Sequence, residues 1–363
     1  MNILWISYIL VGIYTLVLSV ISSKNKRKRF FLIIVSLQLI LLFVMRDIDV
    51  GVDLVRYERV YVDISRSSIL DILGNQEYYT SILFYLIVYI LTRINISYHA
   101  FLGIVGIISV LPYTYLINKY SNHAYLSIII HLSMGIYSFQ FSGLKQSVAM
   151  SLVVLAFIAS IERKKKNFYI YIILAMLFHV TAVICLPFYA LYKLKYRKWM
   201  VGPLFSCLIV VYLFKNRIGY LLTSLFSEGE YIGKYDSSGS IGTVSVLLLI
   251  LLIIILIFAN IDITDNDKKI SYFFKLLIIS ICIQFMSAYA YSFTRLNFYY
   301  LQFLPIIISN IIDLPLKSRF RNDKIKIIFS LLSYCILFIS AFYMYDINVI
   351  NGDNTINYHF YSS

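Results

Sequence analysis

The chain has 363 residues, of which 60% are hydrophobic and only 14% charged, and its mean hydropathy is +0.81. A soluble domain carries about 25% charged residues, so the composition excludes a soluble globular protein. The formal net charge of +14 does not indicate nucleic-acid binding, because many lysines and arginines form short clusters between apolar runs.

Apolar runs long enough to cross a bilayer recur along the whole chain, which predicts an all-α, polytopic integral membrane protein. We expect a single membrane domain over residues 1–363 with about 11–12 membrane-embedded helices, some of them broken or re-entrant. The predicted segments are residues 2–22, 30–45, 78–92, 99–116, 124–141, 146–161, 168–192, 200–214, 243–260, 271–291, 297–312 and 326–345.

Basic clusters indicate which loops are cytoplasmic. The stretches "KNKRKR", "RKKK", "KLKYRK" and "KSRFRNDKIK" follow the positive-inside pattern. This orientation predicts external loops at 46–77 and 215–242 and an external tail at 346–363.

Segment 168–192 is predicted to turn back within the membrane. It alone separates "RKKK" from "KLKYRK", and an odd number of segments also separates "KNKRKR" from "RKKK", so one segment in each interval cannot simply span. Segment 168–192 contains His179 near its middle and Pro187 near its end. A broken segment is tolerated where its backbone is buried in protein or lines a wet cavity, which points to a site.

Ionisable residues at the edges of apolar runs are the candidate site residues. Arg46 follows an apolar run, and Asp53 closes the stretch "VGVD" just after it; an amphipathic surface loop would also explain these charges. Lys145 and Gln146 begin an apolar helix, where a lone lysine also serves as a snorkelling anchor. His179 lies within a segment, where an ionisable residue is functional by default, although a structural interior histidine is the alternative.

A dense tyrosine cluster surrounds the last candidate cation. Arg295 lies on a predicted external turn, with Tyr299 among its neighbours, and interfacial tyrosines are also ordinary belt residues. We expect Arg46, Lys145 and Arg295 at one outer membrane edge, where cations suit an anionic, lipid-linked substrate such as a pyrophosphate. The four cysteines have no metal-ligand spacing and no nucleotide-binding glycine motif occurs, so neither a metal nor a cofactor is predicted.

The same motifs resemble a known family. The order of Arg46 and "VGVD", then "LKQSVAMSLVVLAFI", then "KKKNFYIYIILAMLFHVTAVICLPFYAL", then "TRLNFYYLQFLP" is similar to the EpsG-type membrane proteins, relatives of Wzy-type O-antigen and exopolysaccharide polymerases. The resemblance covers about residues 40–310. One departure is that the family usually has Arg-Gln where this chain has Lys145-Gln146, which keeps the charge and loses the bidentate fork.

The resemblance implies a glycosyltransferase of the bacterial cytoplasmic (inner) membrane, acting in lipopolysaccharide or exopolysaccharide biosynthesis. Its partners would be undecaprenyl-pyrophosphate-linked oligosaccharides, membrane lipids, a chain-length regulator and a flippase. His179 or Asp53 would be the catalytic base, whereas Arg46, Lys145, Gln146, Arg295 and Tyr299 would bind pyrophosphate or substrate. A lipid-linked oligosaccharide flippase or another transporter is the alternative, because it also needs a cationic cavity.

Overall fold

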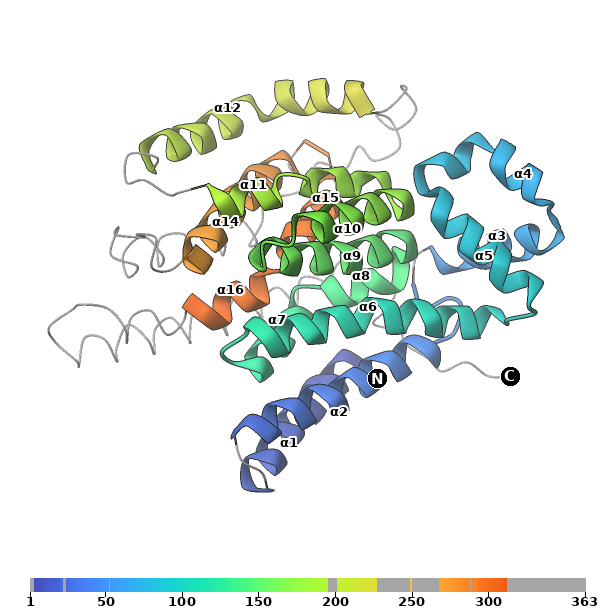
Figure 1. Ribbon diagram of the computed structural model, residues 1–363, viewed down its shortest axis with the longest axis horizontal. Helices are drawn as coiled ribbons and strands as arrows, with labels where there is room; N and C mark the ends of the chain where they lie inside the picture. Colours follow the sequence, from blue (N-terminus) through green and yellow to red (C-terminus); the bar gives the residue numbers. More distant parts are fainter. Residues whose placement is uncertain are drawn as a thin grey trace, which may run out of the picture. The chain divides into compact units, whose positions relative to one another are not determined.

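Helices account for the regular structure wherever residues are described, so the all-α prediction is confirmed (Figure 1). The computed structural model describes residues 3–21, 24–51, 53–194, 201–226, 249, 268–287, 289–290 and 292–311. These fall into two units that are treated separately below: unit 1 runs up to Tyr189, and unit 2 begins at Ala190. The predicted segments 243–260 and 326–345 and the tail 346–363 lie almost wholly outside the described residues.

Unit 1 contains a series of helices that includes two short 3-10 helices, η1 and η2. Its elements are α1 (Ile3–Ile21), α2 (Lys24–Val44), α3 (Leu54–Arg66), α4 (Ile69–Gly74), η1 (Gln76–Ser81), α5 (Ile82–Arg93), α6 (Tyr98–Tyr120), α7 (Ala124–Ser133), α8 (Ile136–Ser142), α9 (Leu144–Ile161), α10 (Lys165–Phe178), η2 (Val180–Cys185) and α11 (Phe188–Lys193), which continues into unit 2.

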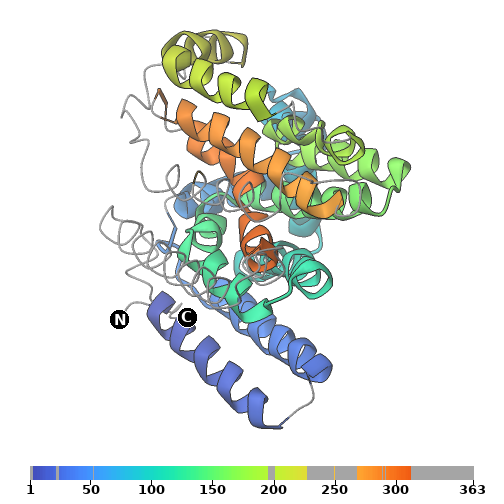
Figure 2. The same cartoon turned by 90° about the vertical axis from the view of Figure 1, so that its left-hand side faces the viewer.

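Four long helices of unit 1 pack side by side in the order α2, α6, α9, α10, and α1 lies beside α2 (Figures 1 and 2). Small residues allow the α2–α6 contact to be close. A Cβ atom added at Gly106 of α6 would lie 2.9 Å from Cβ of Phe43, so the missing side chain makes room for that ring. Among the described residues, α6 and α9 are each long and apolar enough to cross a membrane.

One end of unit 1 collects two of the basic clusters, and we call it the basic end. Lys28 Nζ donates a hydrogen bond of 2.8 Å to the carbonyl oxygen of Ser121 after α6. Glu162 after α9 pairs with Lys119, and its other oxygen lies 2.7 Å from Lys164 Nζ. The stretches "KNKRKR" and "RKKK" therefore lie together, as their common sidedness requires. The end of unit 1 formed by Val44 and the starts of α6 and α9 is called the cap end.

Segment 124–141 is a broken helix. Helices α7 and α8 meet at a bend of 52°, where Gly135 has φ +68, a left-handed conformation that glycine adopts without strain. Taken together the two pieces would form a third membrane span. Helix α9 then starts after the single residue Gly143, so α8 and α9 reverse direction at the cap end without a loop.

Segment 78–92 differs from the prediction. It is divided into η1 and α5, and α5 has 12 residues, fewer than the roughly 20 that a membrane span needs. Helix α5 contacts α3 and α4, and Arg93 at its end donates hydrogen bonds to the carbonyl oxygens of Ser65 and Ser67. With α5 removed from the count, the predicted segments between "KNKRKR" and "RKKK" are those of α2, α6, α7–α8 and α9. Their even number agrees with the predicted common side of the two clusters, which stays a prediction.

Segment 168–192 reverses direction, as predicted. Helix α10 ends at Phe178, and the chain returns through η2 and α11. The ring of Tyr189 in α11 lies 5.4 Å from the ring of Phe168, which is in the first turn of α10. After η2, the chain therefore returns in α11 to a position beside the start of α10. Lys195, which was predicted to be on the same side as Lys165, lies outside the described residues.

Unit 2 contains α12 (Val201–Phe226), α14 (Lys268–Met286), α15 (Ser292–Leu301) and α16 (Leu304–Ile311), and α12 packs on α14. Helix α12 runs twelve residues past its predicted end at 214 and includes part of the loop predicted at 215–242; residues 227–242 lie outside the described part. The buried Lys275 of α14 donates hydrogen bonds of 2.5 and 2.7 Å to the carbonyl oxygens of Leu191 and Leu194, and so caps α11.

Candidate functional site

A tight turn after α2 carries the first candidate residues. The amide of Gly51 donates to the carbonyl oxygen of Asp49 at 3.0 Å, and the amide of Leu54 donates to that of Gly51 at 3.2 Å. Gly51 has φ +134, and a Cβ atom there would lie 2.9 Å from the carbonyl oxygen of Phe141. Only glycine fits this position, so "VGVD" packs the turn directly against the end of α8.

Arg46 is buried just after the end of α2, a few residues before this turn. Its side chain has 0% exposed surface, and its guanidinium carbon lies 4.2 Å from the ring centroid of Phe43 and 4.4 Å from that of Phe141. The two rings contact each other edge to face, with 5.2 Å between their centroids, and the guanidinium packs against both of them, which joins α2 to α8. Arg46 was predicted to bind substrate directly; in this structure it is buried against Phe43 and Phe141, and the binding role stays a prediction.

Asp53 begins α3 at its N-cap position, where it is partly exposed, and its side chain makes no capping hydrogen bond. The helix that follows is anchored at the start of α6. Tyr98 Oη donates to the carbonyl oxygen of Leu54 at 3.0 Å, and Tyr61 Oη donates to that of Ile96 at 2.5 Å. Asp53 is therefore held at the cap end of unit 1.

Lys145 lies in the first turn of α9 and contacts an aromatic pair. Its Nζ donates a hydrogen bond of 3.0 Å to Oη of Tyr85, and the Tyr85 ring stacks on Tyr78 with 3.9 Å between centroids. Burial raises the pKa of the Tyr85 hydroxyl, and the nearby guanidinium of Arg56 partly opposes this effect. Burial also raises the pKa of Tyr78. Tyr85 thus accepts a hydrogen bond from Lys145, and the charge of Arg56 also acts on its hydroxyl.

His179 occupies the reversal between α10 and η2. Its backbone is extended, with φ −159 and ψ 114, and its amide donates to the carbonyl oxygen of Ala175 at 2.8 Å, ending α10. The ring is partly exposed, and its Nδ1 lies 3.1 Å from Oγ1 of Thr181. This contact orients the imidazole ring; the catalytic role of His179 stays a prediction.

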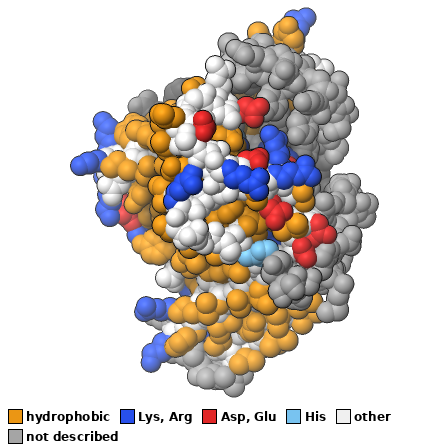
Figure 3. Space-filling model, turned by 90° about the vertical axis from the view of Figure 1, so that its right-hand side faces the viewer, with side chains coloured by type: hydrophobic (Ala, Val, Ile, Leu, Met, Phe, Trp, Pro, Cys, Tyr) orange, Lys and Arg blue, Asp and Glu red, His pale blue; other side chains and the backbone are white. Residues whose placement is uncertain are grey.

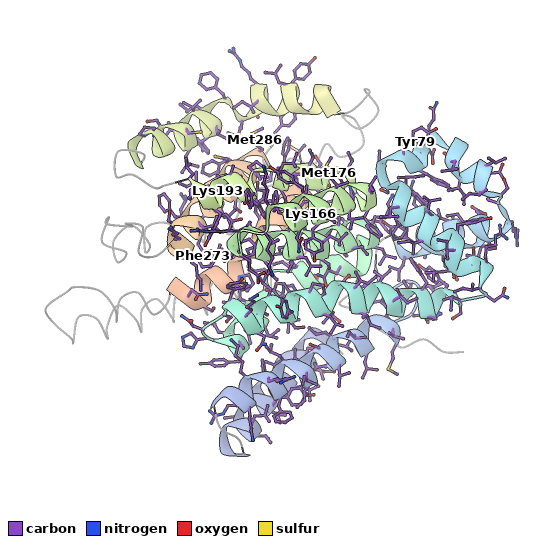
Figure 4. The ribbon with its side chains drawn as sticks, in the orientation of Figure 1. Tyr79, Lys166, Met176, Lys193, Phe273 and Met286 are labelled. Atoms are coloured by element: carbon purple, nitrogen blue, oxygen red, sulfur yellow. The ribbon has the colours of Figure 1, made fainter. Side chains whose placement is uncertain are left out.

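The structure brings part of the predicted site together at the cap end. Helix α10 contacts α9, α5 and η1, so the elements that carry His179, Lys145 and Tyr85 are neighbours, and Asp53 begins the helix that packs on α5. Gln146 is buried. Figure 4 draws these side chains on the ribbon and labels Tyr79 on η1 and Met176 near the end of α10.

Arg295 and Tyr299 lie on α15 in unit 2. Arg295 is partly buried and Tyr299 has 0% exposed surface. Between them Asn297 is fully buried, and its amide nitrogen donates to Oε1 of Gln284 at 2.8 Å while its oxygen accepts from Oγ of Ser280 at 2.9 Å. The predicted convergence of Arg46, Lys145 and Arg295 would join the two units, and it stays a prediction.

Tyr85, Tyr78 and Arg56 were not predicted as site residues. The chain contains 33 tyrosines, so a tyrosine beside an apolar run does not by itself indicate a site. The pairing of Lys145 with Tyr85 becomes visible only when α9 packs against α5. Across the described residues, no group of three His, Cys, Asp or Glu side chains is arranged to hold a metal ion.

Comparison with known proteins supports the resemblance noted in the sequence. Neither the curated proteins nor the solved structures gave a match. The model of the EpsG family, a membrane-associated family of Wzy-like polymerases, matches residues 29–360, nearly the whole chain. This protein therefore belongs to the EpsG family.

Proposed function

We propose that this protein extends a bacterial surface polysaccharide by transferring a glycan from undecaprenyl pyrophosphate onto another lipid-linked repeat unit at the outer face of the cytoplasmic membrane. Membership of the EpsG family supports a polysaccharide polymerase role in general. The donor, the reaction and the side of the membrane are our inference. The observation that carries it is the placement of Lys145, in the first turn of α9 and bonded to Tyr85, at the cap end.

The chemistry requires stabilisation of a departing pyrophosphate. The acceptor hydroxyl oxygen forms a bond to the anomeric carbon of the donor sugar, and the bond from that carbon to the pyrophosphate oxygen breaks. Negative charge then develops on the leaving group. Lys145 adds its charge to the positive end of the α9 dipole, and the charge of Arg56 also acts on Tyr85. Preorganised positive groups at a developing charge are commonly the largest catalytic contribution.

The acceptor hydroxyl must also lose a proton. His179 is the better candidate base, because its ring is partly exposed and Thr181 fixes its Nδ1, so that Nε2 can take the proton. Asp53 at the start of α3 is the second candidate. Histidine suits this role because its pKa lies near neutral pH.

We assign Arg46 a positioning role. Its guanidinium packs against both Phe43 and Phe141, and Phe141 is also the residue whose carbonyl oxygen Gly51 approaches, so Arg46 would hold the end of α8 in place for the turn that precedes Asp53. Arg295 is proposed as a further pyrophosphate contact contributed by unit 2, with Tyr299 behind it. The assignment of Arg46 rests on its contacts with the two rings. The assignment of Arg295 rests on the motif order of the family and on the charge of this residue.

The proposal is tested by deleting the gene in its own organism and separating the extracted glycan on a gel. We expect single repeat units to remain and long chains to disappear, and the wild-type gene to restore the ladder. Loss of the single-unit band as well would indicate flipping or repeat-unit synthesis instead. Purified protein in liposomes that contain a lipid-linked repeat unit should lengthen the glycan without a nucleotide sugar.

A further inference from the structure

Helices α3, α4 and α5 form a small group that joins the end of α2 to the start of α6. Two tyrosine hydroxyls fix the group to the first residues of the span: Tyr98 bonds the carbonyl oxygen of Leu54, and Tyr61 bonds that of Ile96. Arg93 at the end of α5 donates hydrogen bonds to the carbonyl oxygens of Ser65, in the last turn of α3, and Ser67, just after α3. The group is therefore held at the level where α6 begins, which is the boundary of the membrane.

This group exposes apolar side chains that nothing in unit 1 covers. Leu70 of α4 is 75% exposed, more than any other large hydrophobic residue that the structure describes. Ile69, Leu73 and Ile94 are 38%, 46% and 63% exposed. Ile69, Leu70 and Leu73 share one side of a single helical turn. Ile94 follows Arg93, which donates a hydrogen bond to the carbonyl oxygen of Ser67 just before α4.

Charged residues accompany the apolar ones on the same group. Figure 3 shows the surface at this end of unit 1, where basic and acidic side chains lie side by side among apolar patches. The exposed charged residues of α3, α4, η1 and α5 are Arg56, Arg59, Asp63, Arg66, Asp71, Glu77 and Arg93. Asp71 lies within the apolar turn of α4, where its carboxylate accepts a hydrogen bond from the Ser68 amide. Of the arginines, Arg66 is nearest to this turn in sequence, and Arg93 donates a hydrogen bond to the carbonyl oxygen of Ser67 just before it.

We infer that α3–α5 lie in the interfacial layer of the bilayer, with Ile69, Leu70, Leu73 and Ile94 among the upper acyl chains and Arg66 and Arg93 at the lipid phosphates. An amphipathic segment at the end of a span gains by burying its apolar side chains below the headgroups while its charges stay hydrated. A lipid occupant fits better than a protein, because the exposed residues adjoin a membrane span and are flanked by arginines. The inference fixes the depth of Tyr85 and Lys145 at the headgroups, where a lipid pyrophosphate lies.

The test uses the full-length protein in liposomes, with its two tryptophans, Trp5 and Trp199, replaced by phenylalanine. Leu70→Trp places a fluorophore on α4, and Arg59→Trp places a matched one on the charged side of α3. We expect lipids brominated just below the headgroup to quench Leu70→Trp with a blue-shifted emission, and aqueous iodide to quench only Arg59→Trp.

Two outcomes would overturn the inference. Quenching of Leu70→Trp by iodide, as for Arg59→Trp, would place α4 in water. Protection of Leu70→Trp from both quenchers would mean that a protein, such as a second copy of this chain, covers it. If the tryptophan variant does not reconstitute, a nitroxide on Leu70→Cys gives the same distinction through its accessibility to oxygen and to a water-soluble nickel chelate. Neither measurement depends on polymerase activity, so failure here leaves the proposed reaction standing.

Discussion

The ammonium of Lys145 lies 3.0 Å from the hydroxyl oxygen of Tyr85, which joins the first turn of α9 to α5. Residues 60 positions apart in the chain thus place a cation and a neutral acceptor at the cap end of unit 1. The ring of Tyr85 also lies 5.0 Å from the same nitrogen. The hydrogen bond and the ring contact together fix the direction of the lysine side chain at the start of α9.

Replacement of Lys145 should separate charge from geometry. Lys145→Ala should lower polymer formation about 10²–10³-fold, the usual cost of one preorganised donor to a developing charge. Lys145→Arg should retain most activity, since it keeps the charge and restores the residue that the family usually has. Lys166→Ala, an exposed lysine near the basic end, is the control. Glycan chain length at matched protein level is the measurement, and near-normal chains from Lys145→Ala would contradict the assignment.

Arg46 should affect stability as well as activity. Arg46→Ala removes a buried cation that packs against Phe43 and Phe141 and leaves a cavity. We therefore expect a loss of about 2–4 kcal/mol in the free energy of unfolding. Thermal unfolding in detergent, followed with a thiol-reactive dye, measures this loss. An unchanged melting temperature together with abolished polymer would instead make Arg46 a direct substrate contact.

The spans were predictable where hydropathy alone decides. Segments 99–116 and 146–161 correspond to α6 and α9, which are both long and apolar enough to cross a membrane. Segment 78–92 was also predicted as a span, yet η1 and α5 form there, and Arg93 and the contact with α3 hold α5 against α3. Helix α12 was predicted too short because Lys215 and Arg217 resemble loop residues, whereas a helix accommodates both.

The site was predictable where an ionisable residue interrupts an apolar run. Lys145 and His179 stood out for that reason, and the reversal at His179 followed from counting segments between basic clusters. The burial of Arg46 was not predictable, because Phe141 lies far from it in sequence and reaches it only through the packing of α8. Tyr85 was missed for the same physical reason: its partner comes from another helix.

Gly51 should not tolerate a side chain. Its φ of +134 is strained for any side chain, and an added Cβ would press on the carbonyl oxygen of Phe141. Gly51→Ala should therefore cost about 1–3 kcal/mol and displace Asp53 with the turn, reducing polymer length. Gly74→Ala, where nothing lies within 4 Å of an added Cβ, should be neutral. Equal behaviour of the two variants in thermal unfolding and in the glycan ladder would refute the packing argument.

The reversal of segment 168–192 should place Lys165 and Lys195 on the same, cytoplasmic side. Phe168 and Tyr189 lie side by side, so the chain has returned to the start of α10 before "KLKYRK" begins. Single cysteines at 165 and 195, in a background without the native cysteines, can be treated with an impermeant thiol reagent on whole cells. We expect no labelling at either position until the membrane is permeabilised. Labelling of one position from outside would show that the segment crosses.

Glu162 should give the basic end a pH-dependent stability. Hydrogen bonds from Lys119 and Lys164, together with their charges, lower the pKa of this carboxyl in the folded protein. Because the folded pKa is the lower one, the stabilisation is fully present above the unfolded value of about 4.3 and is lost as the pH falls through the folded pKa. Glu162→Gln should therefore lower the free energy of unfolding at pH 7 by about 1 kcal/mol at most, because the group is partly exposed, and lower the melting temperature accordingly. Near pH 3 the substitution should have little effect. Added salt should shrink the difference at neutral pH. A difference that stays constant down to the lowest pH would mean that Glu162 contributes through packing and not through its charge.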